Sequence, residues 1–407
     1  MIQIRNTRQI DYSMTQQNLK LNNTMLVYNL IRDLMPISRV DLARRSPFST
    51  STISNLVEDL LQGKWIIETQ IVQTSARGRR STLLEVNASR GYVATVELLG
   101  RGYICTIYNI CLQKITGTRI RNTAYDSNSI ASTIHTLLKT SHIASCMLIG
   151  IHLIYPGIVD PISGELLSSC AFPDSDILER HLVIQLKKLF RDTHVMISTN
   201  GTIIAFQEFV TQKELPHLPL LSFNVDEAIF GGMVASDADN TMTFCYPVEI
   251  GHLVVDYHGK RCKCGNQGCL ETLCRTPALF QTINARTDLN LQYSETFGSD
   301  LNTSNMSLIA QRLRENDAKV IAVMQEYTQT LSIAIGSIAN LLNVQSIHIG
   351  GDIALLGNPF LQMLKDHLSQ HHAALNMNQV RLELFVNDYE QVRLAATMMC
   401  LDAIFKK

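Results

Sequence analysis

The sequence predicts an α/β protein made of a small N-terminal winged helix-turn-helix and a larger body. Two observations lead to this prediction. Near the N-terminus, three short helical patterns precede two strand patterns, which the basic run Arg77-Gly78-Arg79-Arg80 separates. Through the rest of the 407 residues, strand and helix patterns alternate with glycine turns, as is typical of α/β proteins. The length of this second part implies two lobes.

Composition and charge exclude several classes of protein. Hydrophobic residues make up 46% and charged residues 17%, which supplies real cores and argues against disorder. The net charge of -1 excludes a uniformly basic nucleic-acid coat. Residues 1–80, however, contain 11 Lys or Arg and 6 Asp or Glu, whereas the remainder contains 24 and 30. A basic head on an acidic body is typical of a DNA-binding module joined to an effector domain.

Membrane and export signals are weak in this sequence. The longest uncharged stretches, 327–351 and 140–159, are interrupted by polar residues and make poor spanning helices. The N-terminus lacks the apolar core of a signal peptide, so we expect a soluble, cytoplasmic protein. Three of the ten cysteines fall within one eight-residue window, which indicates metal binding rather than a secreted disulfide scaffold.

The sequence of the head, residues 1–85, predicts three helices. Apolar residues repeat at helical spacing between Leu21 and Met35, and Pro36 stops that helix. Ser38 caps a short second helix over 39–45, and Ser49 or Thr50 caps a third that runs to about residue 61. The residues expected to face inward are Leu26, Val27, Leu30, Ile31, Leu34, Val40, Leu42, Ala43, Ile53, Leu56, Val57 and Leu60.

The start of the third helix carries small polar residues, which suits a recognition helix that enters the major groove. Strands at 65–69 and 81–86 then form a wing with a basic tip, suited to phosphate or minor-groove contacts. The alternative is a plain three-helix domain with an exposed charged hairpin. The candidate DNA-binding residues are Arg39, Ser49, Thr50, Ser51, Thr52, Ser54, Asn55, Arg77, Arg79 and Arg80.

The body is expected to form one lobe over residues 86–199, completed by a C-terminal helix at 388–407, and a second lobe over 200–387. Strands are predicted at 91–98, 103–110, 145–154, 194–198, 218–224, 228–235 and 346–349. Helices are predicted at 130–139, 176–190, about 200–209, 317–342, 358–370 and 388–405.

The strongest chemical pattern lies in the second lobe. His252 is followed by Cys262, Cys264 and Cys269, and one histidine with three cysteines is the ligand set of a closed structural zinc site. The glycines between these cysteines let the chain curl so that three thiolates converge. A local disulfide or free thiols would be the alternatives, which a reduced cytoplasm disfavours.

Residues 249–252 and 259–271 resemble the signature of the ROK family (repressors, open reading frames and kinases). Residues 156–160 and 343–351 match further family segments in the expected order, and the resemblance covers nearly the whole chain. With the predicted winged helix-turn-helix, the chain resembles the family's sugar-responsive repressors of the Mlc and NagC type.

This resemblance implies an actin-like, two-lobed fold of the sugar kinase type and a homodimer or homotetramer that binds double-stranded operator DNA. It implies zinc held by His252, Cys262, Cys264 and Cys269. It also implies a sugar or sugar-phosphate effector in the interlobe cleft. The family's sugar ligands match Asn200, Glu249, His252 and Glu271. The alternative for Glu249 and Glu271 is that they are surface carboxylates near a metal loop.

The sequence departs from the family's kinases at three places. Gly201 stands where the kinases have the aspartate that acts as general base. The first phosphate loop is missing at 96–101, and Asp226 and Glu227 in the second would repel nucleotide phosphates. We therefore expect no phosphoryl transfer. The resemblance also implies an additional C-terminal amphipathic helix, through which such repressors bind a membrane sugar transporter. We expect no helix of this kind beyond the one predicted at 388–405, so the transporter partner is doubtful.

The resulting prediction is a non-enzymatic transcriptional regulator, a repressor of carbohydrate uptake or metabolism genes. Two alternatives stay open at this point. One is an active ROK sugar kinase with a fused DNA-binding head. The other is a zinc-stabilised DNA-binding protein whose cleft no longer binds a ligand.

Overall fold

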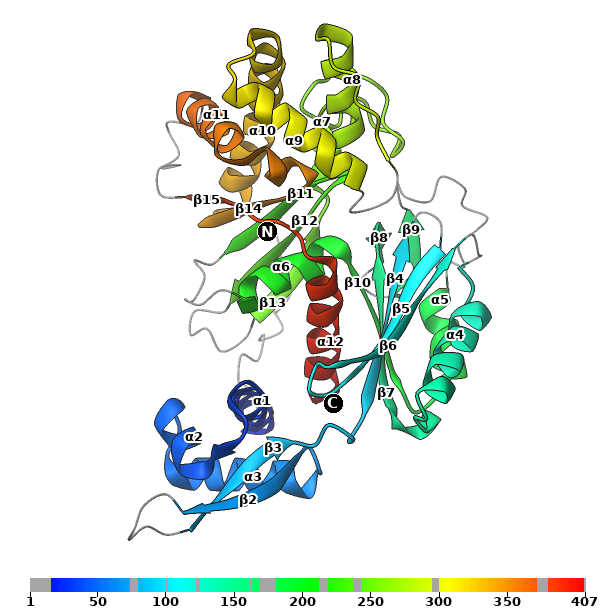
Figure 1. The fold of residues 1–407 in the computed structure, drawn as a ribbon, viewed down its shortest axis with the longest axis vertical. Coiled ribbons are helices and arrows are strands. Elements are labelled where there is room, and N and C mark those ends of the chain that lie inside the picture. The colour runs from blue at the N-terminus through cyan, green and yellow to red at the C-terminus, as the bar shows by residue number, and fades with distance from the viewer. Residues whose placement is uncertain are drawn as a thin grey trace, which may run out of the picture.

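The computed structural model describes residues 16–73, 80–99, 102–121, 125–160, 163–168, 181–211, 219–236, 243–294, 300–371 and 380–405. Within these ranges the chain forms a small head and two α/β lobes, each built on a five-stranded sheet (Figure 1). The predicted α/β class and the two-lobed body are confirmed. Among the helices of these ranges, none combines the length and apolar character needed to cross a membrane.

The head contains three helices and a three-stranded sheet of order β1-β3-β2. Its elements are α1 (Gln16–Leu34), β1 (Ile37–Ser38), α2 (Arg39–Arg45), α3 (Thr50–Gln62), β2 (Ile66–Gln73) and β3 (Arg80–Val86). The hydroxyl of Ser38 accepts the backbone N–H of Asp41, and that of Ser49 accepts the N–H of Thr52. Both predicted caps are therefore confirmed, with Ser49 rather than Thr50 capping α3.

Two residues expected in the core of the head are exposed. Leu26 is 43% and Val40 is 51% exposed, whereas Tyr28 and Leu42 are fully buried. Residues that are two positions apart in a helix lie about 200° apart around its axis. Leu26 therefore lies on the face of α1 opposite Tyr28, and Val40 lies on the face of α2 opposite Leu42. The predicted inner face of α3, in contrast, is buried at all four positions.

Lobe 1 has a sheet of order β10-β7-β4-β5-β6. Its neighbouring strands β6, β5 and β4 are antiparallel, and β4, β7 and β10 are parallel. The strands are β4 (Tyr92–Leu99), β5 (Gly102–Asn109), β6 (Lys114–Arg121), β7 (Leu148–Tyr155) and β10 (His194–Thr199), with the short β8 (Ile158–Val159) and β9 (Leu166–Ser168). The helical segments are α4 (Ser127–Thr140), η1 (Ser145–Met147) and α5 (Leu182–Leu189).

Lobe 2 repeats this arrangement with the order β13-β12-β11-β14-β15. Again three antiparallel strands are followed by two parallel ones. The strands are β11 (Leu220–Val225), β12 (Ile229–Ser236), β13 (Thr243–Val248), β14 (Ser346–Gly351) and β15 (Arg381–Leu384). The helical segments are η3 (Ile250–His252), α7 (Leu270–Cys274), α8 (Thr276–Arg286), α9 (Asp300–Arg314), α10 (Ala318–Leu342), η4 (Asp352–Leu356) and α11 (Gly357–His371).

The sequence patterns did not predict β6, β13, β15 or the helices α7 to α9. The strands β6, β13 and β15 lie at sheet edges, where one side of the strand is unpaired and the apolar alternation is weak. Only residues 182–189 of the helix expected at 176–190 are helical within the described ranges, because residues 169–180 lie outside them.

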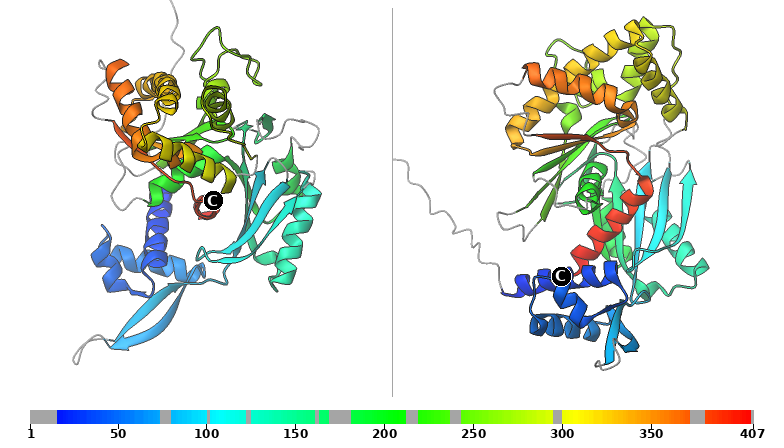
Figure 2. Two further views of the ribbon diagram at one scale, coloured as in Figure 1. Left: turned by 45° about the horizontal axis from the view of Figure 1, so that its top comes forward. Right: turned by 60° about the vertical axis from the view of Figure 1, so that its left-hand side comes forward.

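Two helices lie between the lobes. α6 (Asn200–Thr211) follows β10 and packs on the sheet of lobe 2, while α12 (Tyr389–Phe405) returns from lobe 2 to lobe 1. Figure 2 shows α12, in red, running from the lobe junction to the head. Apolar residues of both helices form one cluster, which contains Ile203, Ile204, Phe206, Val392, Ala395 and Ala396.

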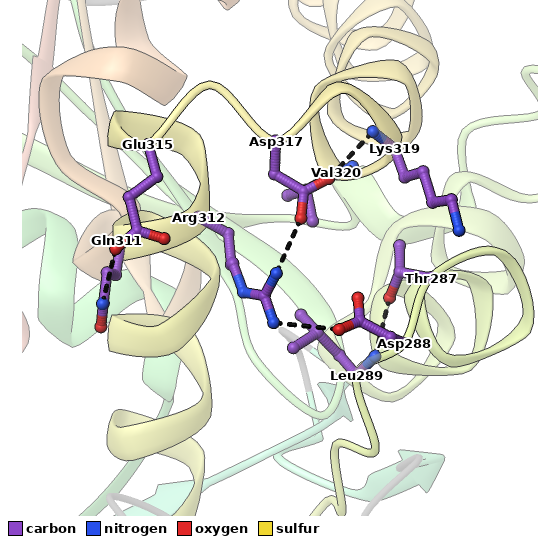
Figure 3. Close-up of polar contacts among 9 residues, drawn as sticks. All are labelled: Thr287, Asp288, Leu289, Gln311, Arg312, Glu315, Asp317, Lys319 and Val320. Carbon is purple, nitrogen blue, oxygen red and sulfur yellow. Dashed lines mark hydrogen bonds and ion pairs between the residues drawn. The ribbon is translucent and has the colours of Figure 1, made fainter.

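At the outer end of lobe 2, an arginine near the end of α9 forms two ion pairs with neighbouring segments. The guanidinium of Arg312 contacts Asp288 at 3.1 Å and Asp317 at 3.0 Å (Figure 3). Asp317 also caps α10, because its carboxylate accepts the backbone N–H groups of Lys319 and Val320. These contacts fix the turn between α9 and α10 away from the lobe junction.

Candidate functional site

A loop between β13 and α7 brings together the four side chains that the sequence singles out. His252 ends η3, Cys269 is the N-cap of α7, and Cys262 and Cys264 lie in the loop between them. Backbone hydrogen bonds close this loop, since the N–H of Cys262 donates to the carbonyl of Asn266 and that of Gly268 to Lys260. Gly265 and Gly268 have φ of 97° and 74°, a left-handed conformation that residues with a side chain rarely adopt.

The ligand atoms of these four residues all lie within 4.8 Å of one another. The Nδ1 of His252 is 3.7 Å from the Sγ of Cys262, and the Sγ atoms of Cys264 and Cys269 are 3.6 Å apart. Sulfur atoms around a tetrahedral zinc with bonds of about 2.3 Å would be about 3.8 Å apart. The four residues therefore fit one tetrahedral metal ion.

Two carboxylates lie next to this cluster. Glu271, on α7, is buried and its Oε2 accepts the backbone N–H of Ile229 at 3.4 Å. Glu249 precedes η3 and has an exposed side chain. Its pKa is raised, chiefly because the surrounding protein displaces water and further because Glu271 adds negative charge, while His252 acts in the opposite direction. Glu249, His252 and Glu271 thus share one electrostatic environment.

The N-terminus of α6 lies against β12, the strand that begins with Ile229. Asn200 is 8% exposed, and its Oδ1 has no hydrogen-bond partner. A Cβ on Gly201 would lie 2.0 Å from the carbonyl oxygen of Gly231, and one on Gly231 would lie 2.2 Å from the side chain of Ile250. At Gly231, strand β12 therefore contacts both the start of α6, which carries Asn200, and η3, which ends at His252.

The two segments that correspond to kinase phosphate loops contain buried carboxylates. Glu97 on β4 is 2% exposed and accepts a hydrogen bond from Arg393 of α12 at 2.7 Å. In lobe 2, Asp226 is 3% exposed, and its Oδ1 accepts the backbone N–H of Asp352. Burial, together with the negative charge of Asp352, raises the pKa of Asp226 well above its ordinary value, and burial raises that of Asp352 to about 6.

Sequence analysis missed Arg393. It lies 296 residues from Glu97, and the sequence contains no local pattern that would pair the two. Only the fold, which returns α12 to lobe 1, places this guanidinium beside the carboxylate.

In the head, the start of α3 is open to solvent. The side chains of Ser49, Thr50, Ser51, Ser54 and Asn55 are exposed, and Thr52 is half-buried. The side chain of Arg39 forms an ion pair with Glu68 of β2 at 2.8 Å. Arg77 and Arg79 lie outside the described residues, and of Arg80 the structure describes only the backbone, at the start of β3.

Comparison with known proteins identifies the body. The model of the ROK family matches residues 96–393. The chain belongs to the ROK family. The matched segment begins just before the buried carboxylate of Glu97 and includes the whole cysteine loop, while the head lies outside it.

The similarity to curated relatives extends beyond the matched segment into the head, because it covers 86 to 90% of this chain. The chain is 23% identical over 376 residues to a putative xylose repressor of Caldicellulosiruptor sp. strain Rt8B.4, which covers 90% of this chain and 92% of that protein. It is 24% identical over 365 residues to the DNA-binding transcriptional repressor Mlc of Escherichia coli K12, with 86% of each chain covered.

Among solved structures, a ROK family transcriptional regulator described as a homologue of E. coli Mlc has a TM-score of 0.71 at 20% identity, and covers 95% of this chain and 97% of its own. A ROK hexokinase from Thermus thermophilus has a TM-score of 0.57 at 15% identity, with 76% of this chain and 98% of its own covered. These similarities confirm the actin-like fold of the ROK body.

Proposed function

We propose that this ROK protein is a DNA-binding transcriptional repressor of carbohydrate uptake or metabolism genes, controlled by a sugar or sugar phosphate bound between its lobes. The observation that carries the proposal is the exposed, capped start of α3 on a head that precedes a ROK body. The head has the element order of a winged helix-turn-helix, in which the second helix of the motif enters the major groove. The named relatives are repressors, which supports this choice.

DNA binding is tested by sequencing genomic fragments retained by the purified full-length protein and measuring their affinity at several salt concentrations. We expect Ser51→Ala and Asn55→Ala to change which sequences are retained, and Arg79→Ala with Arg80→Ala to weaken binding to all sequences alike. Lys188→Ala, an exposed cation on α5 of lobe 1, is the control and should have no effect. Retention of the same fragments with the same affinity by all variants would refute the assignment of the head.

We further propose that the cysteine loop holds one structural zinc ion. One imidazole and three thiolates are the donor set of closed zinc sites, and four protein ligands leave no position for a reactive water. The ion would keep Glu271 in place, because this residue follows Cys269 by two positions. Metal analysis of the purified protein should give one zinc per chain. After treatment with a chelator, the zinc content should fall to near zero and the melting temperature should decrease.

The proposed effector site combines Asn200, Glu249, His252 and Glu271. An amide donates to and accepts from vicinal sugar hydroxyls, and carboxylates accept from them. The unpartnered Oδ1 of the buried Asn200 is available to accept one such hydrogen bond. A panel of D-xylose, D-glucose and N-acetylglucosamine, with the 6-phosphates of the two hexoses, is screened by thermal shift. A bound sugar should raise the melting temperature of the native protein but not that of Asn200→Ala.

No increase with any member of the panel would favour a regulator whose interlobe site has lost its ligand. Equal increases in the native protein and in Asn200→Ala would place the sugar elsewhere on the chain.

We propose that the protein does not transfer phosphoryl groups, although the same fold occurs in a hexokinase. Gly201 carries no general base, and the nearby carbonyl of Gly231 leaves no room for a side chain there. Arg393 pairs with Glu97, and the buried Asp226, in the segment that corresponds to the second phosphate loop, accepts the backbone N–H of Asp352. ATP-dependent phosphorylation of any sugar in the panel at an ordinary enzymatic rate would overturn this part of the proposal.

The proposed regulator acts as a homodimer or homotetramer on a pseudo-palindromic operator, because two recognition helices read two half-sites. Light scattering of the purified protein, alone and with operator DNA, measures the assembly. A monomer in both conditions would contradict it.

A further inference from the structure

The C-terminal helix α12 contacts both the region between the lobes and the head. Its first half packs on α6, the helix that begins with Asn200, through Val392, Ala395 and Ala396. Its last residue, Phe405, lies against Trp65 and Tyr28 of the head, with ring centroids 4.1 and 4.8 Å apart. A single helix therefore touches the element that starts at the proposed effector site and the core of the proposed DNA-binding unit.

The first half of α12 is fixed to lobe 1 by two buried polar contacts. The guanidinium of Arg393 contacts Glu97 on β4, and the Nδ1 of His152 on β7 is 2.6 Å from the carbonyl oxygen of Ala396. Glu97 and His152 are almost fully buried, so loss of either contact would leave a polar group without water or partner. These contacts hold one register of α12 on the sheet.

The head is packed onto the body rather than tethered to it. The apolar cluster that includes Tyr28 and Ile31 of α1 continues into Val93 of β4 and Cys400 and Leu401 of α12. The hydroxyl of Tyr28 donates to the carbonyl of Ile110 at 2.7 Å.

The segment between β3 and β4 is also bound to the head. The side chain of Asn87 donates to the carbonyl of Lys64, and the guanidinium of Arg90 lies 4.8 Å from the ring centroid of Trp65. A displacement of α12 therefore cannot be absorbed by a free linker at this junction.

We infer that α12 transmits changes between the lobes to the DNA-binding head, with the Glu97–Arg393 pair as its anchor and Phe405 as its contact. The inference rests on the proposed function, which supplies the effector and the operator. Phe405 lies twelve residues after Arg393, about 18 Å along a helix. Because α12 is continuous over this length, a shift at its anchored half moves the aromatic contact at its end.

The sequence supplies a reporter for this contact, since Trp65 is its only tryptophan. Quenching of tryptophan fluorescence by acrylamide thus reports the exposure of the junction between α12 and the head, without DNA or sugar. Arg393→Met is compared with Lys114→Met, which removes the exposed pair between Lys114 of β6 and Glu390 in the first turn of the same helix. Both substitutions remove one cation that lies beside α12 or on it.

We expect the quenching constant of Trp65 to rise at least about twofold in Arg393→Met and to stay unchanged in Lys114→Met. The quenching constant of Arg393→Met is compared only after zinc content and a cooperative thermal transition show that the variant is folded. If it does not fold, Glu97→Gln/Arg393→Met takes its place, because this double variant leaves neither charge unpaired.

An unchanged quenching constant in the folded variant, or an equal rise in Lys114→Met, would overturn the inference. Either outcome is distinct from failure of the proposed function, which would appear as absence of specific DNA binding in the native protein.

Discussion

The two lobes of the body repeat one strand order but bury different titratable groups. Lobe 1 buries His152, whose pKa falls to about 4, chiefly because burial disfavours the charged imidazole. Lobe 2 buries Glu208 and Asp352, whose pKa values rise to about 7 and about 6, also chiefly because of burial. The response of each lobe to protons or ligands is therefore determined by the side chains that the sheet carries, and not by the strand order that the two lobes share.

The lobes also differ in what holds their surfaces together. In lobe 2, the proposed zinc ion would join three thiolates of one loop that would otherwise repel one another. Lobe 1 instead continues through apolar packing into α12 and the head. We expect lobe 2 to be sensitive to ligand chemistry and lobe 1 to mutation of buried contacts.

The largest effect should follow loss of a metal ligand in lobe 2. Cys269→Ser removes a fully buried thiolate, and we expect loss of zinc and of more than about 5 kcal/mol of the folding free energy of that lobe. Metal analysis and thermal unfolding measure both. The matched control is Cys274→Ala, also buried and on the same helix, which should retain zinc. Full zinc content in Cys269→Ser would show that the cluster does not bind metal as proposed.

The next largest effect should come from the close approach of α6 to β12. Gly201→Ala places a Cβ 2.0 Å from a backbone carbonyl, and we expect a loss of about 3 to 4 kcal/mol in unfolding free energy because backbone must move. Gly357→Ala is the control, since its backbone, with φ of 70° and ψ of -157°, costs about 1 to 3 kcal/mol for a residue with a side chain, while its Cβ meets no atom within 4 Å. Equal losses in urea unfolding would show that the contact relaxes freely.

Local features of the sequence predicted most of the head and the metal ligands. Caps such as Ser38 and Ser49 bind a backbone N–H three residues later, so the local sequence is enough to predict them. The metal ligands lie within the 18 residues from His252 to Cys269, so their spacing along the chain predicts that they converge. Contacts that depend on the assembled fold had no such signal. The pairs Glu97–Arg393 and His152–Ala396 join strands of lobe 1 to a helix more than 240 residues later.

The third prediction tests the pH response of lobe 1. The folded pKa of His152, about 4, lies below its ordinary value of 6.5, so the unfolded chain binds the proton more readily. Lobe 1 should therefore lose up to about 2 to 3 kcal/mol of stability as the pH falls from 6.5 to 4. His152→Gln keeps a donor to Ala396 and an acceptor for Ser198 but does not titrate in this range.

Urea unfolding at pH 5 and pH 7 compares the two proteins. The native protein should be less stable at pH 5, and the difference between the two pH values should be smaller in His152→Gln. The same pH difference in both proteins would mean that another group in the chain causes it.

The last predicted effect has the opposite sign and belongs to lobe 2. Glu208 lies on α6 against His348 of β14, and its folded pKa of about 7 exceeds the ordinary 4.5. The folded state thus retains a proton that the unfolded chain has released, and stability is lost as the pH rises from about 4.5 to 7. We expect a loss of up to about 2 to 3 kcal/mol, which would be larger without His348, because this residue lowers the pKa of Glu208.

Glu208→Gln keeps a neutral side chain of the same size at every pH, so its stability relative to the native protein should increase between pH 5 and pH 8. The exposed Glu390 of α12 provides the control, since Glu390→Gln should show no such increase. If Glu208→Gln loses stability relative to the native protein at pH 8, Glu208 is ionised in the folded state and forms a net favourable pair with His348. In that case the contrast between the lobes would be restricted to His152 and the acids around Asp226.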